Sequence, residues 1–395
     1  MSIKQKFFSK NAFQGIFYLL TYAIPMFILS QLLQFNSKYK DIWIVCERFN
    51  EARDNGYHLF KYIREKHSKI KCFYIIDRSS ADLSKVGSFE NVIYFGTFKH
   101  YLYYFLAKRH ISTHGAGNGC MPNIYACKLL DFIVKPRAKN VYLKHGIIKD
   151  DLPSLHKNKS RIDLFVCGAS LEYKLVKEKF GFNNNEVKYL GLARFDNLMN
   201  FSAKKQIMYM PTWRTFLRYS NSKEFKESNY YKKINALLNN KELIDFLDHN
   251  DVSFVLCLHP LLKEYSHLFN KTGKNIKINN TAENDIQLLL KESALLITDH
   301  SSIYFDFAYM NKPIVYYQFD NEEFFKSHSG IRKFDYLKQG FGPVLKNEEE
   351  LVKQVINISN NNFKNTRLYE KRIEDCFPLR DNKNCERNFL SILNL

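Results

Sequence analysis

Short apolar runs rich in aromatic and β-branched residues alternate with helical stretches along most of this chain. Residues 42–49 and 71–77 are typical of buried strands, and the segment GYHLFKYIREKH between them has apolar residues three and four positions apart. The series continues to about residue 191. Strands that alternate with helices form parallel sheets, because parallel strands need a crossover connection. The sequence therefore predicts an α/β fold.

The alternation then starts again at residue 206. Strand-like runs occupy residues 206–214, 251–260, 274–280, 293–302 and 313–320, with helical stretches at 231–246 and 303–311, and two further helices are expected after residue 348. A chain of 395 residues is long enough for two domains. We predict an N-terminal sheet domain over residues 41–203 and a C-terminal one over 204–395, whose last helix packs back on the first domain.

The chain begins with a different kind of segment. Residues 11–37 contain no charged side chain, whereas Lys4, Lys6 and Lys10 precede them and Lys38 and Lys40 follow. About 20 apolar residues suffice to span a bilayer, but a proline in the middle should kink or break the helix, here at Pro25. Two amphipathic pieces lying on an anionic membrane surface fit equally well, and a helix packed on the protein's own body is the alternative. We expect residues 1–40 to form a membrane-associating helical segment.

The charge balance points to negatively charged partners. The 59 Lys and Arg residues exceed the 40 Asp and Glu residues, which gives a net charge of +19. Nucleic acid, an anionic membrane and phosphate-rich substrates would all fit. No helix-turn-helix, zinc-finger or RNP-like pattern occurs and the lysines are scattered, so we expect no nucleic-acid partner.

The cysteines indicate neither a disulfide framework nor a metal site. Cys46, Cys72, Cys167 and Cys257 lie inside apolar runs, as small buried residues of a reducing compartment do. No CxxC pair occurs, and no carboxylate pair with ligand spacing stands near the motifs described next. We expect no metal.

Polar side chains follow the strand-like runs directly. They are His114, His145, Arg194, Thr212, Arg214, His259, Asp299, His300, Ser301 and Ser302. Ligands of open parallel sheets bind beyond the carboxyl ends of the strands. Two facing sheets would bring these residues together around one cleft.

The first of these motifs is KHGIIK, residues 144–149. His145 follows a strand at once and is a candidate general base, since an imidazole titrates near neutral pH. Gly146 permits a sharp turn, and Lys149 adds attraction for phosphate. Upstream, His114 precedes the glycine-rich GAGNG (115–119) and is a candidate acceptor contact.

The second half contributes a candidate anion site. Ser301 and Ser302 lead into an apparent helix whose first NH groups attract anions, and Asp306 is spaced to share a helix face with Ser302. The alternative is that Asp299 or Ser301 only caps this helix. Trp213 offers a plane for a base to stack on, and Arg214 offers a fork for a diphosphate.

Five motifs in order resemble a known family. KHGIIK (144–149), GLARFD (191–196), MPTWR (210–214), LHPL (258–261) and ITDHSSIYFDFA (297–308) are similar to motifs of the CDP-glycerol glycerophosphotransferases, the teichoic-acid primases and polymerases and their capsule-polymer relatives. The resemblance covers about residues 140 to 345. It implies a GT-B-like fold of two facing Rossmann-like domains, held peripherally or monotopically at the cytoplasmic face of the membrane.

The resemblance also implies a reaction. The family transfers glycerol phosphate from CDP-glycerol to a hydroxyl of a lipid-linked or polysaccharide acceptor and releases CMP, without a cofactor. By position, the catalytic residues would be His145 as base and His259 on the donor diphosphate. The donor site would comprise Gly146, Ile147, Ile148, Lys149, Arg194, Thr212, Trp213, Arg214, Cys257, Leu258, Ser301, Ser302 and Asp306.

This sequence departs from the family pattern at a few positions. Cys257 stands where a basic residue is expected, His300 replaces an aromatic residue, and IIK after Gly146 replaces Thr-Pro. These departures affect the identity of the alditol, glycerol, ribitol or another, more than the chemistry. The alternative is a GT-B glycosyltransferase that uses a nucleotide sugar for capsule or lipopolysaccharide synthesis.

Overall fold

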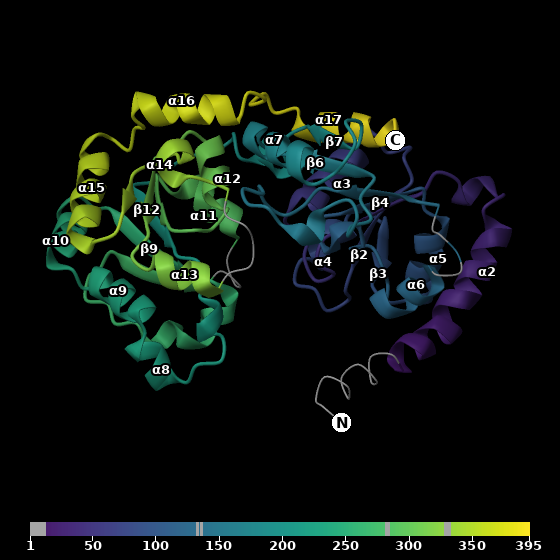
Figure 1. Cartoon of the computed structure of the whole chain (residues 1–395), viewed down its shortest axis with the longest axis horizontal. Helices are drawn as coiled ribbons and strands as arrows, with labels where there is room; N and C mark the ends of the chain where they lie inside the picture. Colours follow the sequence, from purple (N-terminus) through teal and green to yellow (C-terminus); the bar gives the residue numbers. More distant parts are fainter. Residues whose placement is uncertain (1–12, 132–133, 135–136, 281–284, 328–332) are drawn as a thin grey trace. The chain divides into compact units, whose positions relative to one another are not determined.

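A computed structural model describes residues 13–131, 134, 137–280, 285–327 and 333–395, and it divides the chain into two compact units. Unit 1 comprises the described chain up to Ile147, Pro153–Asp196 and Asp381–Leu395, and unit 2 comprises Ile148–Leu152 and Asn197–Arg380. Each unit contains one parallel sheet covered by helices, as the alternating pattern predicts (Figure 1).

Unit 1 contains a seven-stranded sheet. Its strands are β1 (Trp43–Cys46), β2 (Cys72–Ile76), β3 (Val92–Tyr94), β4 (Arg109–Ser112), β5 (Lys139–Tyr142), β6 (Leu164–Cys167) and β7 (Val187–Tyr189), in the order β3-β2-β1-β4-β5-β6-β7. The helices are α3 (Asn55–Lys66), α4 (Leu83–Gly87), α5 (Phe98–Leu106), α6 (Ile124–Asp131) and α7 (Ser170–Lys179). The strand order reverses between β1 and β4, so the loops after β1, β4 and β5 emerge together where such sheets bind ligands.

Unit 2 contains a six-stranded sheet. Its strands are β8 (Gln206–Met210), β9 (Ser253–Leu258), β10 (Ile276–Asn280), β11 (Leu295–Thr298), β12 (Ile314–Tyr317) and β13 (Val344–Leu345), in the order β10-β9-β8-β11-β12-β13. Its helices are α8 (Ser222–Glu227), α9 (Asn229–Leu238), α10 (Lys241–His249), α11 (Ile286–Glu292), α12 (Tyr304–Tyr309), α13 (Asn321–Ser327), α14 (Tyr336–Gln339), α15 (Glu348–Asn360) and α16 (Arg367–Cys376). The helix predicted over 231–246 is two helices, because the Asn240 side chain caps a new one at Leu243 N.

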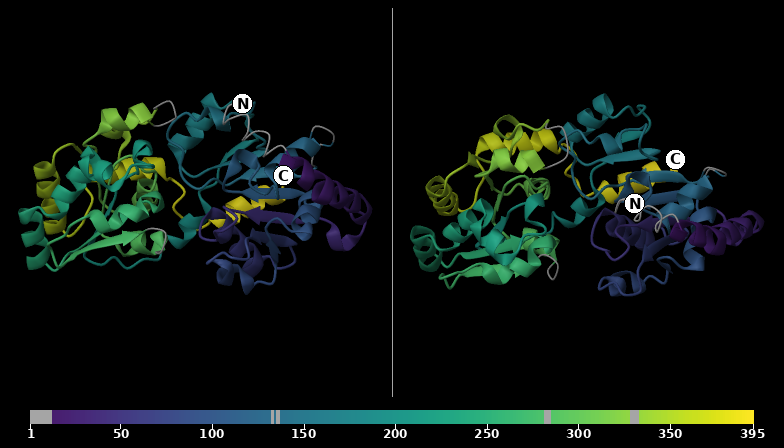
Figure 2. Two further views of the ribbon diagram at one scale, coloured as in Figure 1. Left: turned by 90° about the horizontal axis from the view of Figure 1, so that it is seen from below. Right: turned by 60° about the horizontal axis from the view of Figure 1, so that its bottom comes forward.

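The C-terminal segment forms three helices rather than the two predicted: α15, α16 and α17 (Asn384–Leu393). Helix α17 belongs to unit 1 and packs against α3. Asp196 accepts hydrogen bonds from Asn384 N (2.9 Å) and Cys385 N (2.8 Å), and the Phe389 ring stacks on His67 at 3.9 Å. Both views in Figure 2 show this yellow helix crossing the blue strands of unit 1.

The N-terminal helix is continuous from Phe13 to Leu33, so of the two outcomes predicted for Pro25, a kink or a break, the break does not occur. The chain forms a π-helical turn, η1 (Leu19–Ala23), and continues as α2 (Ile24–Leu33), with Ile24 N donating to Leu19 O. A π turn accommodates a proline because its hydrogen bonds join residues five positions apart. The backbone bonds around Pro25 can therefore form without the N–H that proline lacks. The predicted contacts of Lys4, Lys6 and Lys10 lie outside the described residues.

This helix has one packed face and one exposed face. It packs on α5 and α6: Ala23 and Ser30 are buried, and Tyr22 stacks on Phe98 at 4.4 Å. The opposite face exposes apolar side chains, namely Phe13, Ile16, Phe17, Leu20, Ile28 and Leu32. By length and composition the helix could cross a membrane, yet it also rests on the protein's own body, as the alternative interpretation expected.

Candidate active site

In unit 1 the site begins with two histidines at the ends of neighbouring strands. His114 follows β4 and His145 follows β5, and these strands pair in parallel. Their imidazole rings stack, with centroids 4.8 Å apart and planes 8° apart. His145 is exposed and His114 is half-buried. The structure thus brings together the predicted base and the candidate acceptor contact.

The two imidazoles differ in their surroundings. Burial is the main cause that lowers the pKa of His114 to about 3, and the adjacent His145 contributes because two positive charges would repel. The Nδ1 atom of His114 lies 2.7 Å from the Thr113 hydroxyl. His114 is therefore neutral at physiological pH, and His145 is the member of the pair that is open to solvent.

The backbone before His145 is held by a buried ion pair. Lys144 has a left-handed φ of 48°, and its Nζ donates to Glu172 (2.9 Å) and to the carbonyl of Val166 (2.8 Å). The left-handed residue of the predicted turn is therefore Lys144, not Gly146. Since a left-handed residue with a side chain is strained, the Lys144–Glu172 pair fixes a conformation that the free chain would avoid.

Arg194 supports the same backbone instead of a phosphate. Its Nη1 donates to Asp54 Oδ1 (2.7 Å) and to the His145 carbonyl (2.8 Å), and the residue is 6% exposed. Asn55 joins both loops, because its Oδ1 accepts from Arg194 N and its Nδ2 donates to the Lys144 carbonyl at 2.8 Å. In this structure the Arg194 guanidinium is a buried brace for the His145 loop, and its predicted phosphate contact stays a prediction.

Residues at the start of α3, which no motif predicts, also hold this edge of the sheet. Glu47 follows β1 directly and accepts hydrogen bonds from the backbone N of Arg53, Asp54 and Tyr57, at 2.7 to 2.9 Å. Burial, with nearby Asp54, raises the pKa of Glu47 to about 8. The sequence contained a sign of this role, because Glu47 is a carboxylate directly after an apolar strand. That strand, β1, lies where the strand order of the sheet reverses.

The residues after Gly146 pass from one unit to the other. Ile147 belongs to unit 1, Ile148 to unit 2, and both are buried, so neither presents a side chain to a ligand in this structure. Lys149 Nζ lies 2.7 Å from Asp150 and 5.6 Å from the centre of the Tyr336 ring. Asp150 in turn accepts from Lys333 N at 2.9 Å.

In unit 2 the candidate residues lie beyond three adjacent strands, β9, β8 and β11. The Trp213 and His259 rings stack with centroids 5.7 Å apart, and His259 Nδ1 accepts from Leu261 N at 3.3 Å. Thr212 donates to Asp299 through its N (2.8 Å) and its hydroxyl (2.5 Å). Both Trp213 and His259 are half-buried, so they can still meet a ligand.

In this structure Arg214 is held by two carboxylates, and the diphosphate contact predicted for it stays a prediction. The residue is fully buried, and its guanidinium donates to Asp320 through Nε and Nη2 (both 2.7 Å) and to Asp299 through Nη2 (2.9 Å). Burial alone would raise the pKa of Asp299, but Arg214 beside it lowers that pKa below its ordinary value. Arg214 fixes Asp299, which in turn fixes Thr212.

The ITDHSS motif is also arranged differently from the prediction. Helix α12 begins only at Tyr304, so Ser302 precedes it and does not share a helix face with Asp306. The Ser301 hydroxyl accepts from Ile303 N, the N-cap residue of α12, at 3.4 Å, as the capping alternative expected of Ser301, whereas Asp299 accepts from His300 N at 2.5 Å. Ser301 and Ser302 are half-exposed, whereas Asp306 is buried, as are Cys257 and Leu258 inside β9. The side chains of Asp306, Cys257 and Leu258 are thus buried in this structure, and their predicted ligand contacts stay predictions.

Two parallel-sheet units with their candidate residues at the carboxyl ends of the strands define a GT-B-like α/β protein. The solved structure of the wall teichoic acid polymerase TagF has this fold: it matches the whole chain with a TM-score of 0.68 at 18% identity, over 97% of that chain. The profile of the CDP-Glycerol:Poly(glycerophosphate) glycerophosphotransferase family matches residues 26–394, and the chain belongs to that family.

Two curated relatives are similar to this chain over different lengths. The minor teichoic acid biosynthesis protein GgaB of Bacillus subtilis is 32% identical over 372 residues, which are 90% of this chain and 40% of that protein. The teichoic acid glycerol-phosphate primase of the same organism is 28% identical over 183 residues, 44% of each chain. The chain thus spans less than half the length of either relative.

Proposed function

We propose that this chain transfers an alditol phosphate, glycerol phosphate in the first instance, from a CDP-alditol to a hydroxyl of a lipid-linked or polysaccharide acceptor in cell-surface polymer synthesis. The observation that carries the proposal is the exposed His145, stacked on a neutral His114 at the carboxyl edge of the sheet in a member of this family. Because His114 stays neutral, His145 is the imidazole of this pair that would exchange a proton with a substrate.

In the proposed reaction His145 takes the proton of the acceptor hydroxyl. The acceptor oxygen forms a bond to the β-phosphorus of the donor as the bond from that phosphorus to the bridging oxygen breaks, and CMP departs with the electron pair. Such transfers depend on position and on charge stabilisation rather than on a covalent intermediate. The bracing of the His145 backbone by Arg194 and Lys144 supplies the position.

The donor is assigned to unit 2 within this proposal. Trp213 and His259 form a half-buried aromatic pair, and the hydroxyls of Ser301 and Ser302 are half-exposed beyond β11. An imidazole and hydroxyls can donate to phosphoryl oxygens as charge develops on them. Thr212, held by Asp299, orients the loop that carries Trp213. None of these roles requires a metal.

The deciding experiment offers purified protein a panel of donors with a membrane extract. CDP-glycerol, CDP-ribitol and UDP-sugars are supplied in turn, and released CMP and UDP are measured. We expect CMP from a CDP-alditol, and loss of that release in His145→Gln. Release of UDP alone would establish the alternative, a nucleotide-sugar glycosyltransferase, and overturn the proposal.

We further propose that the N-terminal helix lies in the plane of the cytoplasmic membrane surface. Its packing on α5 and α6 runs along one face, while its other face exposes Phe17, Leu20 and Ile28. Helix α6 adds exposed Ile124 and Tyr125 beside it, since Gly15 contacts Tyr125. An apolar face joined to a folded domain suits insertion at the lipid interface.

Substitutions on that exposed face test the proposed location. Leu20→Glu should release the protein from vesicles in a flotation assay without unfolding it, because Leu20 is 61% exposed. Leu288→Glu, at a position on unit 2 that is 53% exposed, is the matched control and should leave flotation unchanged. Undiminished flotation of Leu20→Glu would contradict the in-plane location.

A further inference from the structure

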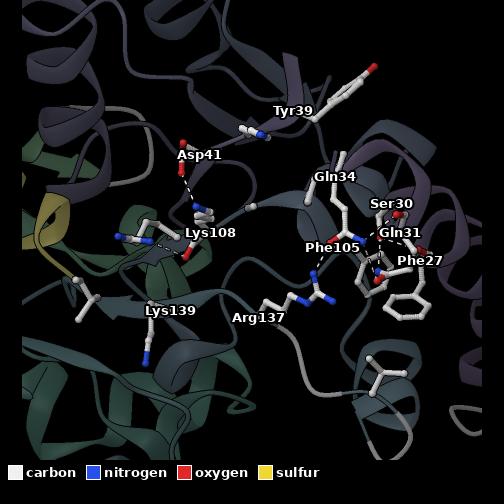
Figure 3. A pocket seen from close by; sticks show the side chains of 16 residues that line it. Phe27, Ser30, Gln31, Gln34, Tyr39, Asp41, Phe105, Lys108, Arg137 and Lys139 are labelled. Carbon is white, nitrogen blue, oxygen red and sulfur yellow. Dashed lines mark hydrogen bonds and ion pairs between the residues drawn. The ribbon is translucent and has the colours of Figure 1, made fainter. Parts of the chain in front are cut away.

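A basic cavity of about 360 Å³ lies at the amino edge of the unit 1 sheet (Figure 3). Its walls come from the last turns of α2, the chain leading into β1, the end of α5 and the first residues of β4 and β5. None of these residues belongs to the candidate active site. Five basic residues line the cavity: Lys40, Lys108, Arg109, Arg137 and Lys139.

The cavity carries a positive excess. Asp41 is the acidic side chain among its lining residues, and Lys108 Nζ lies 2.7 Å from Asp41 Oδ1. The hydrogen bond from Lys108 lowers the pKa of Asp41, and the charges of Lys71 and Arg109 lower it further despite some burial. A carboxylate in this setting stays ionised, and Asp163 lies 3.6 Å from Lys139, so the five lining cations face two nearby carboxylates and keep a positive excess. Such a concentration of charge attracts an anion.

Arg109 and Arg137 are held in place by uncharged partners. Arg137 donates to the side chain of Gln34, and in Figure 3 its guanidinium points toward the Gln34 end of α2. Arg109 donates from Nε to the carbonyl of Ile392 at 3.1 Å. Carbonyl and amide oxygens orient these guanidinium groups without cancelling their charge. Planar, oriented guanidinium groups bind phosphate by paired hydrogen bonds.

One wall of the same cavity is apolar and continues onto the lipid-facing helix. Phe27 of α2 and Phe105 of α5 line it, with their rings in edge contact at 5.5 Å. Beside them α2 exposes Ile28 and Leu32, which are 56% and 71% exposed. A ligand with an anionic head and a hydrocarbon tail would meet cations at one end and apolar side chains at the other.

The position of the cavity excludes the reacting acceptor group. Arg109 begins β4 and Lys139 begins β5, whereas His114 and His145 follow the far ends of the same strands. Four residues of strand rise about 13 Å, so a phosphate at Arg109 and Lys139 cannot place its own neighbouring hydroxyl on His145. The cavity therefore serves something other than the transferred group.

We propose that this cavity binds the phosphate headgroup of an anionic glycerophospholipid and so docks unit 1 on the bilayer. The proposal rests on the proposed membrane location of the N-terminal helix and extends it to a specific lipid class. The phosphate engages Arg137 and Lys108, whose ammonium group has donors left beside the one that meets Asp41. An acyl chain follows Phe27 toward the exposed face of α2. The diphosphate of an isoprenoid lipid has similar chemistry and is the competing source.

The test compares two variants of the full chain that carry the same change in net charge. The cavity variant is Lys108→Gln with Arg137→Gln. The control is Lys223→Gln with Lys226→Gln, at exposed positions of α8 in unit 2. Binding is measured by flotation with vesicles of phosphatidylcholine alone, with added phosphatidylglycerol, and with added isoprenyl diphosphate.

We expect the cavity variant to lose about tenfold or more of its affinity for phosphatidylglycerol vesicles, and the control to bind as the original chain does. Equal losses in both variants would reduce the effect to overall charge and overturn the proposal. So would a loss confined to vesicles with isoprenyl diphosphate. CMP release is measured separately, in detergent with a water-soluble acceptor. If the original chain released no CMP, the proposed function would be wrong, but the vesicle result would still test the lipid site.

Discussion

The imidazole rings of His114 and His145 lie face to face, with their centroids 4.8 Å apart. The strands that carry them pair in parallel, so the two loops that follow emerge at one edge of the sheet. His114 is half-buried, which lowers its pKa to about 3 and keeps it neutral, whereas His145 is exposed to solvent. This pair is the part of unit 1 best suited to handle a proton.

Replacing His145 by Gln should lower CMP release by a factor of about 10² to 10⁴, the usual contribution of a general base. The fold should be unaffected because the ring is exposed. The rate is measured with saturating donor, and the melting temperature is measured alongside. His249→Gln, at an exposed histidine of α10, is the control and should retain full activity. Full activity in His145→Gln would remove the proposed base.

The acidic limb of the rate–pH profile should belong to His145 and not to His114. With a pKa of about 3, His114 does not titrate between pH 5 and 9. His114→Gln should therefore raise the KM for the acceptor while the midpoint of the acidic limb stays within about 0.3 pH units of its original value. A midpoint that moves by a full unit would show that His114 gains a proton in that range.

Arg194 should act through the position of His145. Both hydrogen bonds come from the one Nη1 atom, and lysine keeps the charge but has a shorter side chain, which does not place a nitrogen where Nη1 meets Asp54 and the His145 carbonyl. Arg194→Lys should lower kcat roughly tenfold or more with little change in the KM for the donor, since a misplacement of about 1 Å is costly in such reactions. A direct phosphate contact would instead raise the donor KM, so steady-state kinetics with varied donor separate the two roles.

The buried Arg214 should be a stability residue. Arg214→Met leaves the carboxylates of Asp299 and Asp320 buried without their cation, which costs about 3 to 5 kcal/mol. Calorimetry of the single variant is compared with that of the triple variant in which Asp299 and Asp320 are also replaced by Asn. We expect the triple variant to recover part of the loss. If the single variant were as stable as the original chain, the ion pairs would contribute nothing.

The alternation of apolar runs and helical stretches was enough to predict the fold, because buried parallel strands are continuous apolar runs with helices between them. It could not show that Ile148–Leu152 joins the second unit, since that depends on Asp150 meeting Lys333 N far along the chain. The rule that ligand-binding residues follow strands selected His145 and His114, and their rings are stacked in the structure. The same criterion could not show that Arg194 and Arg214 meet carboxylates, because a polar residue after a strand can face a ligand or a buried carboxylate.

Asp54 and Asn55 illustrate what motifs cannot show. They cap and begin α3 in a stretch without any motif, and they gain a role only because the fold brings them to Arg194 and Lys144. Likewise Pro25 predicted a kink or a break, whereas the helix continues through a π turn that packs against α5 and α6. Local sequence sets preferences, whereas tertiary contacts decide which one is realised.

Two buried histidines should make unit 1 sensitive to acid. Burial lowers the pKa of His100 to about 3 and of His110 to about 4. His100 Nδ1 accepts from Gly96 N (3.1 Å), and Nε2 lies 3.1 Å from the Cys120 carbonyl, which requires the neutral ring with its proton on Nε2. Below about pH 6.5 the unfolded chain binds protons at these rings and the folded chain does not. The free energy of unfolding therefore falls as the pH falls from about 6.5 toward 4.

The slope of that fall measures the number of such histidines. Each contributes about 1.4 kcal/mol per pH unit once the unfolded ring is fully protonated. Urea unfolding is followed by Trp43 fluorescence in a Trp213→Phe background, because Trp43 is buried in unit 1. Between pH 5 and 6 the slope in His100→Gln should be shallower by about 1 kcal/mol per pH unit, whereas exposed His249→Gln should leave it unchanged. Equal slopes in all three proteins would mean that His100 takes up its proton in the folded state.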